Sequence, residues 1–339
     1  MDTVRYRAFV TAAEKGTIKE AAEEMGYTSS AISQLIKALE EELDTELLVR
    51  SRTGVTLTSG GVTLLPVARE ILAQEEKLYQ TAADLNGMLA GRLTIAAYPS
   101  IATKWLPYLI QRFQDEHPGV SFALREGSWE DMYGWIEERS VDLAFIADAS
   151  DTPYDWVPLA TDELVAVLPL SHPMADGSLY PLSRLEEEKA IALSELGRDH
   201  EVAPRLRAQG AVWQTKFVAK EPHSVMTMVS QDMCMTITNR MNTVSWYDKV
   251  AVLPLDPPLT ETIGVLAPSL ERLSPAARYF LDLAVTRYSE REFRDGRRFS
   301  GFCAEKSAEE YPSALFILMV TPARFERATP AFGEQCSIP

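Results

Sequence analysis

The sequence predicts a multidomain α+β and α/β protein with three successive parts: a small helical unit that ends in a β-hairpin, one long helix, and a larger unit of alternating strands and helices. Two helix signals and a hairpin signal fall within residues 17–58. Apolar residues at alternating spacings of four and three then recur over residues 64–89. From residue 93 onward, short apolar segments alternate with amphipathic ones, which indicates a mainly parallel sheet.

The small unit is predicted to contain two helices separated by a tight turn. Thr17 and Glu20 have the spacing of a capping box, in which a hydroxyl and a carboxylate bind free amides, so a helix begins at Ile18. Gly26 can adopt the positive φ that ends this helix. The next helix begins near Ser29, and its apolar residues share one face: Ile32, Ile36, Leu39 and Leu43. Its other face carries Ser30, Ser33, Gln34 and Lys37.

The polar face of the second helix has the residue types that read duplex DNA. Hydroxyl and amide side chains suit base edges in the major groove, and a lysine one turn later suits a phosphate. The following hairpin, residues 49–57, carries Arg50 and Arg52, which can reach phosphates or a narrow minor groove. Taken singly, each feature also fits an amphipathic surface helix or a solvated hairpin. Together they predict a winged helix-turn-helix DNA-binding domain over residues 1–58.

Residues throughout this unit resemble those of the LysR-type transcriptional regulators. The resemblance spans about residues 1–291 and rests on Phe9-Val10, Ala12-Ala13-Glu14, Ala21-Ala22, Ala31-Ile32-Ser33-Gln34, Ile36, Leu39-Glu40, Leu47-Leu48-Val49-Arg50 and Leu57-Thr58-Ser59-Gly60-Gly61. It implies that the DNA-facing residues are Ser29, Ser30, Ser33, Gln34, Lys37, Arg50 and Arg52. Many relatives carry Gln-Pro in place of Ser29-Ser30 and further basic residues in place of Thr53-Gly54. These departures concern the operator sequence rather than the mode of binding.

The charge of the chain limits how it can hold DNA. The formal net charge is −16, and residues 1–58 contain seven basic and ten acidic side chains. This balance argues against general attraction to nucleic acid. We therefore expect weak non-specific binding and a shallow dependence of DNA affinity on salt.

Composition and rare residues exclude several classes of protein. A hydrophobic content of 46%, without an apolar run near the roughly 20 residues of a membrane span, predicts a protein of the cytoplasm. Four scattered histidines and three widely spaced cysteines, Cys234, Cys303 and Cys336, predict no disulfide framework, metal site or bound cofactor. The chain shows no serine-histidine-acid spacing or glycine-rich phosphate loop, so we expect no enzyme activity.

The middle part, residues 59–90, is predicted to be a linker and dimerisation helix. Its repeat consists of Leu64, Ala68, Ile71, Glu75, Leu78, Ala82, Leu85 and Leu89, in which the charged Glu75 weakens an otherwise apolar pattern. A helix with this stripe either pairs with its twin or lies along a domain of the same chain. Pro66 is least costly if the helix begins near Gly61. The resemblance implies a dimer or tetramer that presents two recognition helices to DNA.

The last large part, residues 91–291, is predicted to be an effector-binding domain. Strands are expected at 93–98, 120–124 and 141–146, with helices at 103–116 and 129–138 between them. The resemblance implies the two-lobed α/β fold of type II periplasmic binding proteins, with lobe I at 91–161 and 265–291 and lobe II at 162–264. The chain then crosses between the lobes twice, so a small molecule held between them can favour one orientation.

Residues at the expected strand ends and across the cleft are candidate effector contacts. Ligands of open α/β sheets bind beyond the carboxyl ends of the strands, which points to Ser100, Ile101, Ser128 and Trp129. The family pattern adds Ser194, His223 and Ser224. Ser100 could instead cap a helix, Trp129 could belong to the core, and a lone histidine such as His223 is often structural. Where relatives often show Gly-x-Gly, this chain has Asp232-Met233-Cys234, and we expect Cys234 to be buried rather than redox-active.

After Arg291 the pattern dissolves, and we interpret residues 292–339 as a non-native or disordered tail, or else as an ordered addition to the effector domain. The leading hypothesis for the chain is a dimeric or tetrameric transcription factor that binds promoter DNA and responds to a small-molecule effector, without a cofactor. The alternative is a two-lobed small-molecule-binding protein, or an enzyme, whose N-terminal helices serve assembly only.

Overall fold

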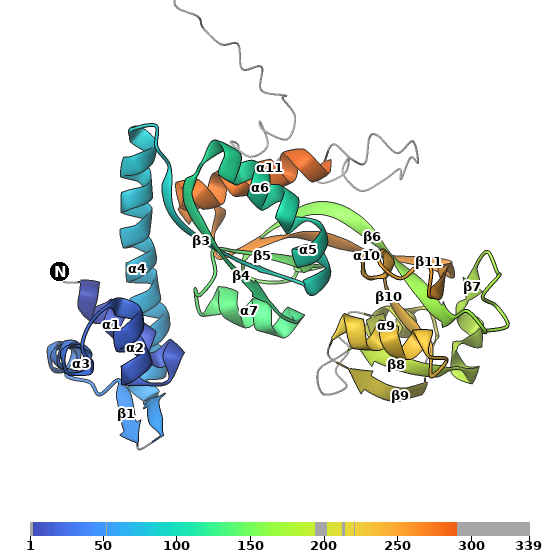
Figure 1. The fold of residues 1–339 in the computed structure, drawn as a ribbon, viewed down its shortest axis with the longest axis horizontal. Helices are drawn as coiled ribbons and strands as arrows, with labels where there is room; N and C mark the ends of the chain where they lie inside the picture. Colours follow the sequence, from blue (N-terminus) through green and yellow to red (C-terminus); the bar gives the residue numbers. More distant parts are fainter. Residues whose placement is uncertain (1–2, 52, 194–201, 212–213, 220, 290–339) are drawn as a thin grey trace, which may run out of the picture. The chain divides into compact units, whose positions relative to one another are not determined.

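The computed structural model describes residues 3–51, 53–193, 202–211, 214–219 and 221–289. Arg52, Ser194 and the predicted tail at 292–339 lie outside these residues. The N-terminal domain packs α1 (Thr3–Lys15), α2 (Ile18–Met25) and α3 (Ser29–Leu43) with the antiparallel hairpin β1 (Leu48–Ser51) and β2 (Gly54–Leu57) (Figure 1). Its core contains the fully buried side chains of Phe9, Ile32, Ile36, Leu39 and Leu47.

The helix ends of this domain follow from local capping. The Thr17 hydroxyl accepts a hydrogen bond from the Glu20 amide at 3.1 Å, and Gly26 ends α2 with φ of 70°, which confirms both predicted boundaries. Thr28 caps α3 in the same way. The prediction for Leu43 was wrong: its side chain is 38% exposed, because α3 ends there and Asp44 turns the backbone to a positive φ.

The next helix, α4 (Ser59–Leu85), is divided between buried and exposed apolar residues. Leu65 and Ala68 are buried in the core of the N-terminal domain, with Leu64 and Ile71 partly buried against it. Leu78 and Leu85 remain 67% and 85% exposed. The N-terminal half of the apolar repeat therefore packs within the chain, and its C-terminal half leaves Leu78 and Leu85 on the surface.

Two details of the predicted linker differ in the structure. Because α4 begins at Ser59, Pro66 lies inside the helix rather than in its first turn, and the helix continues past it. Leu89, predicted as the last residue of the repeat, follows the end of α4 and is buried. The helix ends at Leu85 with Asn86 as its C-cap, and Gly87 takes a φ of 69° before the chain enters the next domain.

Lobe I is built on β3 (Ala90–Ala97), β4 (Gly119–Glu126) and β5 (Leu143–Ala147), with β3 parallel to both neighbours. The helices of this lobe are α5 (Pro99–Lys104), α6 (Leu106–Glu116), α7 (Trp129–Glu137) and α11 (Pro275–Ser289), with the 3-10 turn η2 (Leu270–Arg272) before α11. The single helix predicted at 103–116 is in fact two, because Trp105 separates α5 from α6 and Pro107 starts a new first turn.

Lobe II contains shorter elements. They are β7 (Tyr180–Pro181), the 3-10 helix η1 (Leu182–Glu187), β8 (Lys189–Leu193), α8 (Val202–Ala208), β9 (Gln214–Ala219), α9 (Pro222–Ser230), β10 (Thr236–Asn239) and α10 (Arg240–Thr243). Strands β8 and β9 form a separate parallel pair. The core of this lobe also draws on the strand β6 (Asp155–Pro169), and its buried residues include Leu164, Ala166, Leu168, Tyr180 and Leu206.

The two lobes are joined by two long strands, β6 and β11 (Val250–Ala267), which pair with each other in antiparallel register. The sheet order is β10-β6-β11-β5-β3-β4, so one mixed sheet continues through both lobes. The expectation of a mainly parallel sheet holds only for β3, β4 and β5, because the returning strand β11 runs antiparallel to β5. The two predicted crossings thus form a single two-stranded ribbon (Figure 1).

A carboxyl group in lobe I makes the stability of this domain dependent on pH. Asp142 Oδ2 accepts a hydrogen bond from the Thr94 amide at 2.7 Å, and burial raises the pKa of Asp142 to about 6 although this bond opposes the shift. The folded chain therefore binds this proton more tightly than the unfolded chain does. The resulting gain in the free energy of unfolding is complete below the ordinary pKa of 3.8 and is lost as pH rises through about 6.

We expect the Asp142→Asn variant to be more stable than wild type at pH 7, by up to about 3 kcal/mol, because its amide stays neutral and can still accept from Thr94. Urea unfolding of the full chain at pH 4.5 and pH 7 measures this difference. The difference between the two proteins should be clearly smaller at pH 4.5 than at pH 7, and an equal pH dependence in both would contradict the assignment.

Candidate nucleic-acid interface and effector domain

An open groove lies between α3 and β1. It is lined by Ser30, Ser33, Gln34, Lys37, Glu40, Glu46, Leu48, Val49 and Arg50. The structure thus brings five of the predicted DNA-facing residues to one surface: Ser30, Ser33, Gln34, Lys37 and Arg50. Ser29 is exposed in the first turn of α3 but does not line the groove, and Arg52 lies outside the described residues.

Glu40 is a functional residue that the sequence patterns did not reveal. Its Oε1 accepts hydrogen bonds from the amides of Leu47 at 2.9 Å and Leu48 at 3.2 Å. These bonds fix the start of β1 against α3, and Arg50 adds a contact from its guanidinium to the Ser33 carbonyl at 3.5 Å. Glu40 therefore positions the wing beside the recognition helix, a role that depends on contacts seven and eight residues along the chain.

Carboxylates accompany most of the cations of the N-terminal domain. Among the described residues, the ion pairs of these cations are Arg5–Glu42, Arg7–Glu75, Lys15–Glu24, Lys19–Glu23 and Lys37–Glu41. The Lys37–Glu41 pair measures 3.5 Å, and both side chains are exposed. Since exposed ion pairs are weak, a DNA phosphate can replace the Glu41 carboxylate as the partner of Lys37. The displaced carboxylate stays nearby and repels the phosphate. This arrangement gives a physical reason for the predicted shallow salt dependence.

We expect the Glu41→Gln variant to bind unrelated duplex DNA about 1.4- to 5-fold more tightly, which corresponds to the ~0.2–1 kcal/mol of an exposed ion pair. Because the phosphate at Lys37 is then no longer repelled by a carboxylate, the slope of log affinity against log salt should steepen by part of the roughly 0.9 of one full phosphate contact. Fluorescence anisotropy at several salt concentrations measures both. Glu23→Gln, which frees Lys19 outside the groove, is the matched control. Equal slopes for wild type and Glu41→Gln would contradict this interpretation of the pair.

The predicted effector contacts of lobe I lie at two helix starts. Ser100 and Ile101 are in the first turn of α5, where Tyr98 is the N-cap and Ile101 is fully buried. Ser128 caps α7 and forms a capping box with Asp131. The half-buried Trp129 stacks on Tyr133 with ring centroids 5.1 Å apart.

Lobe II supplies the other predicted contacts and two links to lobe I. His223 and Ser224 are exposed in the first turn of α9, and the His223 ring lies 5.1 Å from that of Trp246. Ser194 lies outside the described residues. Lys104 of lobe I donates to Ser245 of lobe II at 3.1 Å, and Arg205 of lobe II forms an ion pair with Asp148 of lobe I.

Cys234 has the environment of a core residue. It is 5% exposed and packs with Val165, Val225 and Met226. Burial raises the pKa of its thiol to about 11, so the reactive thiolate is scarce at neutral pH. The neighbouring Asp232 takes a φ of 59°, as expected for the residue that replaces a glycine. These observations agree with a packing role for Cys234.

The described residues hold no cluster of three or more side chains suited to a metal ion. Among the helices of the described chain, none combines the length and apolar character needed to cross a bilayer. A winged helix-turn-helix joined by a long helix to a two-lobed α/β domain defines a class of transcription regulator in which one polypeptide carries both domains.

Comparison with known proteins identifies the family. The model for the bacterial regulatory helix-turn-helix protein, lysR family, matches residues 4–62, and the model for the LysR substrate binding domain matches residues 86–289. The chain belongs to the LysR family of transcriptional regulators. It is therefore a regulator with a DNA-binding helix-turn-helix domain and an effector-binding domain, and its relatives are transcription regulators rather than enzymes.

Two relatives from Bacillus subtilis (strain 168) match over nearly their whole length. The HTH-type transcriptional regulator YoaU is 31% identical over 295 residues, which are 83% of this chain and 97% of YoaU. The transcriptional dual regulator GltC is 25% identical over 297 residues, which are 86% of this chain and 99% of GltC.

Solved structures share the fold. A full-length OxyR variant from Pseudomonas aeruginosa has a TM-score of 0.69 at 20% identity, covering 84% of this chain and 94% of OxyR. Full-length CbnR in complex with its target DNA has a TM-score of 0.60 at 18% identity, covering 85% of this chain and 100% of CbnR.

Proposed function

We propose that this protein binds promoter DNA through the groove between α3 and β1, as a dimer or tetramer, and that a small-molecule effector between the lobes of its effector domain changes this binding. The observation that carries the proposal is the gathering of Ser30, Ser33, Gln34, Lys37 and Arg50 in one groove of a LysR-family helix-turn-helix domain. Their donors and acceptors suit base edges and phosphates. CbnR, which shares the fold, was determined in complex with its target DNA, and this supports DNA as the partner.

The exposed stripe of α4 supports self-association. Val67, Leu78 and Leu85 are 52%, 67% and 85% exposed, and their spacings of eleven and seven residues place them along one line of the helix. The opposite side of α4 carries the buried Leu65 and Gln80, which pack within the same chain. A second copy of α4 would cover the stripe.

The effector is proposed to be a small metabolite, and its binding is proposed to require neither a cofactor nor a metal ion. At the α7 start, the Ser128 hydroxyl and the Asp131 carboxylate already occupy the helix amides, and Glu130 adds a second acidic side chain. This position therefore disfavours an anionic group of the ligand. A regulator that acts on promoter DNA in this way works in the cytoplasm.

A gel-shift with the full chain and a duplex of the gene's own upstream region tests the proposal. A discrete shifted complex that survives excess unrelated DNA is expected, with a stoichiometry of two or four chains. A thermal-shift screen of a metabolite panel, followed by the gel-shift with each hit, then tests the effector. Binding that unrelated DNA removes completely would contradict sequence-specific recognition.

A further inference from the structure

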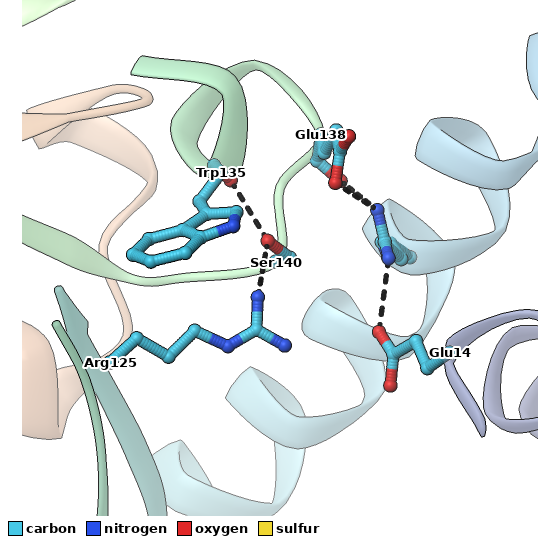
Figure 2. A network of polar contacts seen from close by, with 6 residues as sticks. Glu14, Arg125, Trp135, Glu138 and Ser140 are labelled. Carbon is cyan, nitrogen blue, oxygen red and sulfur yellow. Dashed lines mark hydrogen bonds and ion pairs between the residues drawn. The ribbon is translucent and has the colours of Figure 1, made fainter. Parts of the chain in front are cut away.

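Arg69 of α4 touches both domains that α4 connects. Its side chain is 9% exposed, and Nη2 lies 3.1 Å from Oε1 of Glu14, near the end of α1. Nη1 donates to the Glu138 side chain at 3.1 Å and to the Glu138 carbonyl at 3.2 Å, just after α7 (Figure 2). One planar guanidinium therefore joins the N-terminal domain to lobe I of the effector domain.

The burial of Arg69 is not optimised for stability. Its Nε is buried without a hydrogen-bond partner among the described residues. A buried donor without a partner lowers stability, because it loses its hydrogen bonds to water.

The segment that meets Arg69 is braced within lobe I. The Ser140 hydroxyl accepts a hydrogen bond from Arg125 Nη1 at 3.1 Å and donates to the Trp135 carbonyl at 3.3 Å (Figure 2). The guanidinium of Arg125 also lies over the Trp135 ring at 5.5 Å. The turn after α7 is thus tied to the helix and to β4, and it moves with them.

The other end of α7 carries the predicted effector contacts Ser128 and Trp129. The nine residues of α7 form a rod of about 14 Å between these contacts and Glu138. On the far side of Arg69, Glu14 belongs to α1, which shares a core with α3 through Phe9, Ile32 and Ile36. A continuous series of packed elements therefore leads from the effector side of α7 to the recognition helix.

We propose that Arg69 is a positioning residue that couples the effector domain to the DNA-binding domain. This inference rests on the proposed function, because it assigns the regulation of the same two sites. A displacement of α7 changes how Glu138 meets the guanidinium, and the rigid plane of its donors passes the change to Glu14 and α1. By reciprocity, DNA bound at α3 alters α7.

Hydrogen exchange of the full chain, with and without a saturating duplex of the gene's own upstream region, tests this coupling. In wild type, DNA is expected to change exchange of the amides in residues 129–140 by at least about fivefold, the lower end of common allosteric couplings. In Glu14→Ala and Glu138→Ala this change should be lost, while DNA affinity stays within about threefold of wild type. Both carboxylates are partly exposed, so these variants avoid leaving a cavity.

Glu137→Ala is the matched control, since Glu137 is exposed and adjacent to Glu138. It should keep the DNA-induced change. An undiminished change in Glu14→Ala and Glu138→Ala, or no change in wild type that binds the duplex, overturns the coupling and leaves the proposed function intact. Failure of wild type to bind any DNA specifically overturns the proposed function as well.

Discussion

The Gln34→Ala variant is expected to lose most of its preference for the operator over unrelated DNA. Gln34 is exposed in the groove between α3 and β1, where its amide can bind an adenine edge. Such a contact contributes about 1–3 kcal/mol of discrimination, so operator affinity should fall roughly 5- to 150-fold. The phosphate contacts remain, and both the affinity for unrelated DNA and the salt slope should stay unchanged.

Lys37→Ala is expected to behave differently, because a lysine that contacts a phosphate carries no sequence information. Affinity should fall by a similar factor for operator and unrelated DNA, and the salt slope should become less steep by at most about 1. Anisotropy titrations of both variants on both duplexes, together with footprinting, separate the two effects. Footprints identical to wild type in both variants would contradict the assignment of the groove.

The second large effect is expected at Gly61, in the first turn of α4. A Cβ on Gly61 would lie 2.1 Å from the Leu47 carbonyl oxygen, which already accepts the Thr58 amide at 3.0 Å. Because this nearest obstacle is backbone, Gly61→Ala must separate α4 from the start of β1. We expect the N-terminal domain to lose about 3 kcal/mol of stability, the upper range for overpacking.

Gly134→Ala in α7 is the matched control, since nothing lies within 4 Å of its added Cβ. There the same substitution should stabilise the helix by about 0.5–1 kcal/mol. Hydrogen exchange of α1–α3 and of α7 in the full chain measures the two domains separately. Unchanged protection of the N-terminal amides from exchange in Gly61→Ala would show that α4 can shift without a loss of stability, which would contradict the prediction.

Patterns confined to a few neighbouring residues were the most informative. Thr17, Gly26 and the apolar face of Ile32, Ile36 and Leu39 predicted α2 and α3 because capping and amphipathicity are local. The groove residues followed from the same helix face. Glu40 and Arg69 could not be found this way, since their partners are distant in sequence: Glu40 binds the amides at the start of β1, and Arg69 binds Glu14 and Glu138.

Other differences arose where two structures satisfy one pattern. The apolar repeat of α4 fits both a coiled coil and packing against the same chain, and the structure shows the second for its N-terminal half and leaves Leu78 and Leu85 exposed. Alternating strands and helices predict parallel pairing, but they do not reveal the direction of β11, which returns from lobe II. The roles of Ser100, Ser128, His223 and the other effector candidates stay predictions.

The ribbon between the lobes has a consequence for changing the length of the chain. Pro254 pairs with Val165 and Leu259 with Leu164, so residues 255–258 are extra on β11, and Leu255 and Asp256 pair with β7 instead. Adding a residue within one of the regularly paired stretches of β6 or β11 would turn every following side chain to the opposite face. Adding one within 255–258 leaves the strands on both sides in register, which makes this segment the natural place to graft a loop.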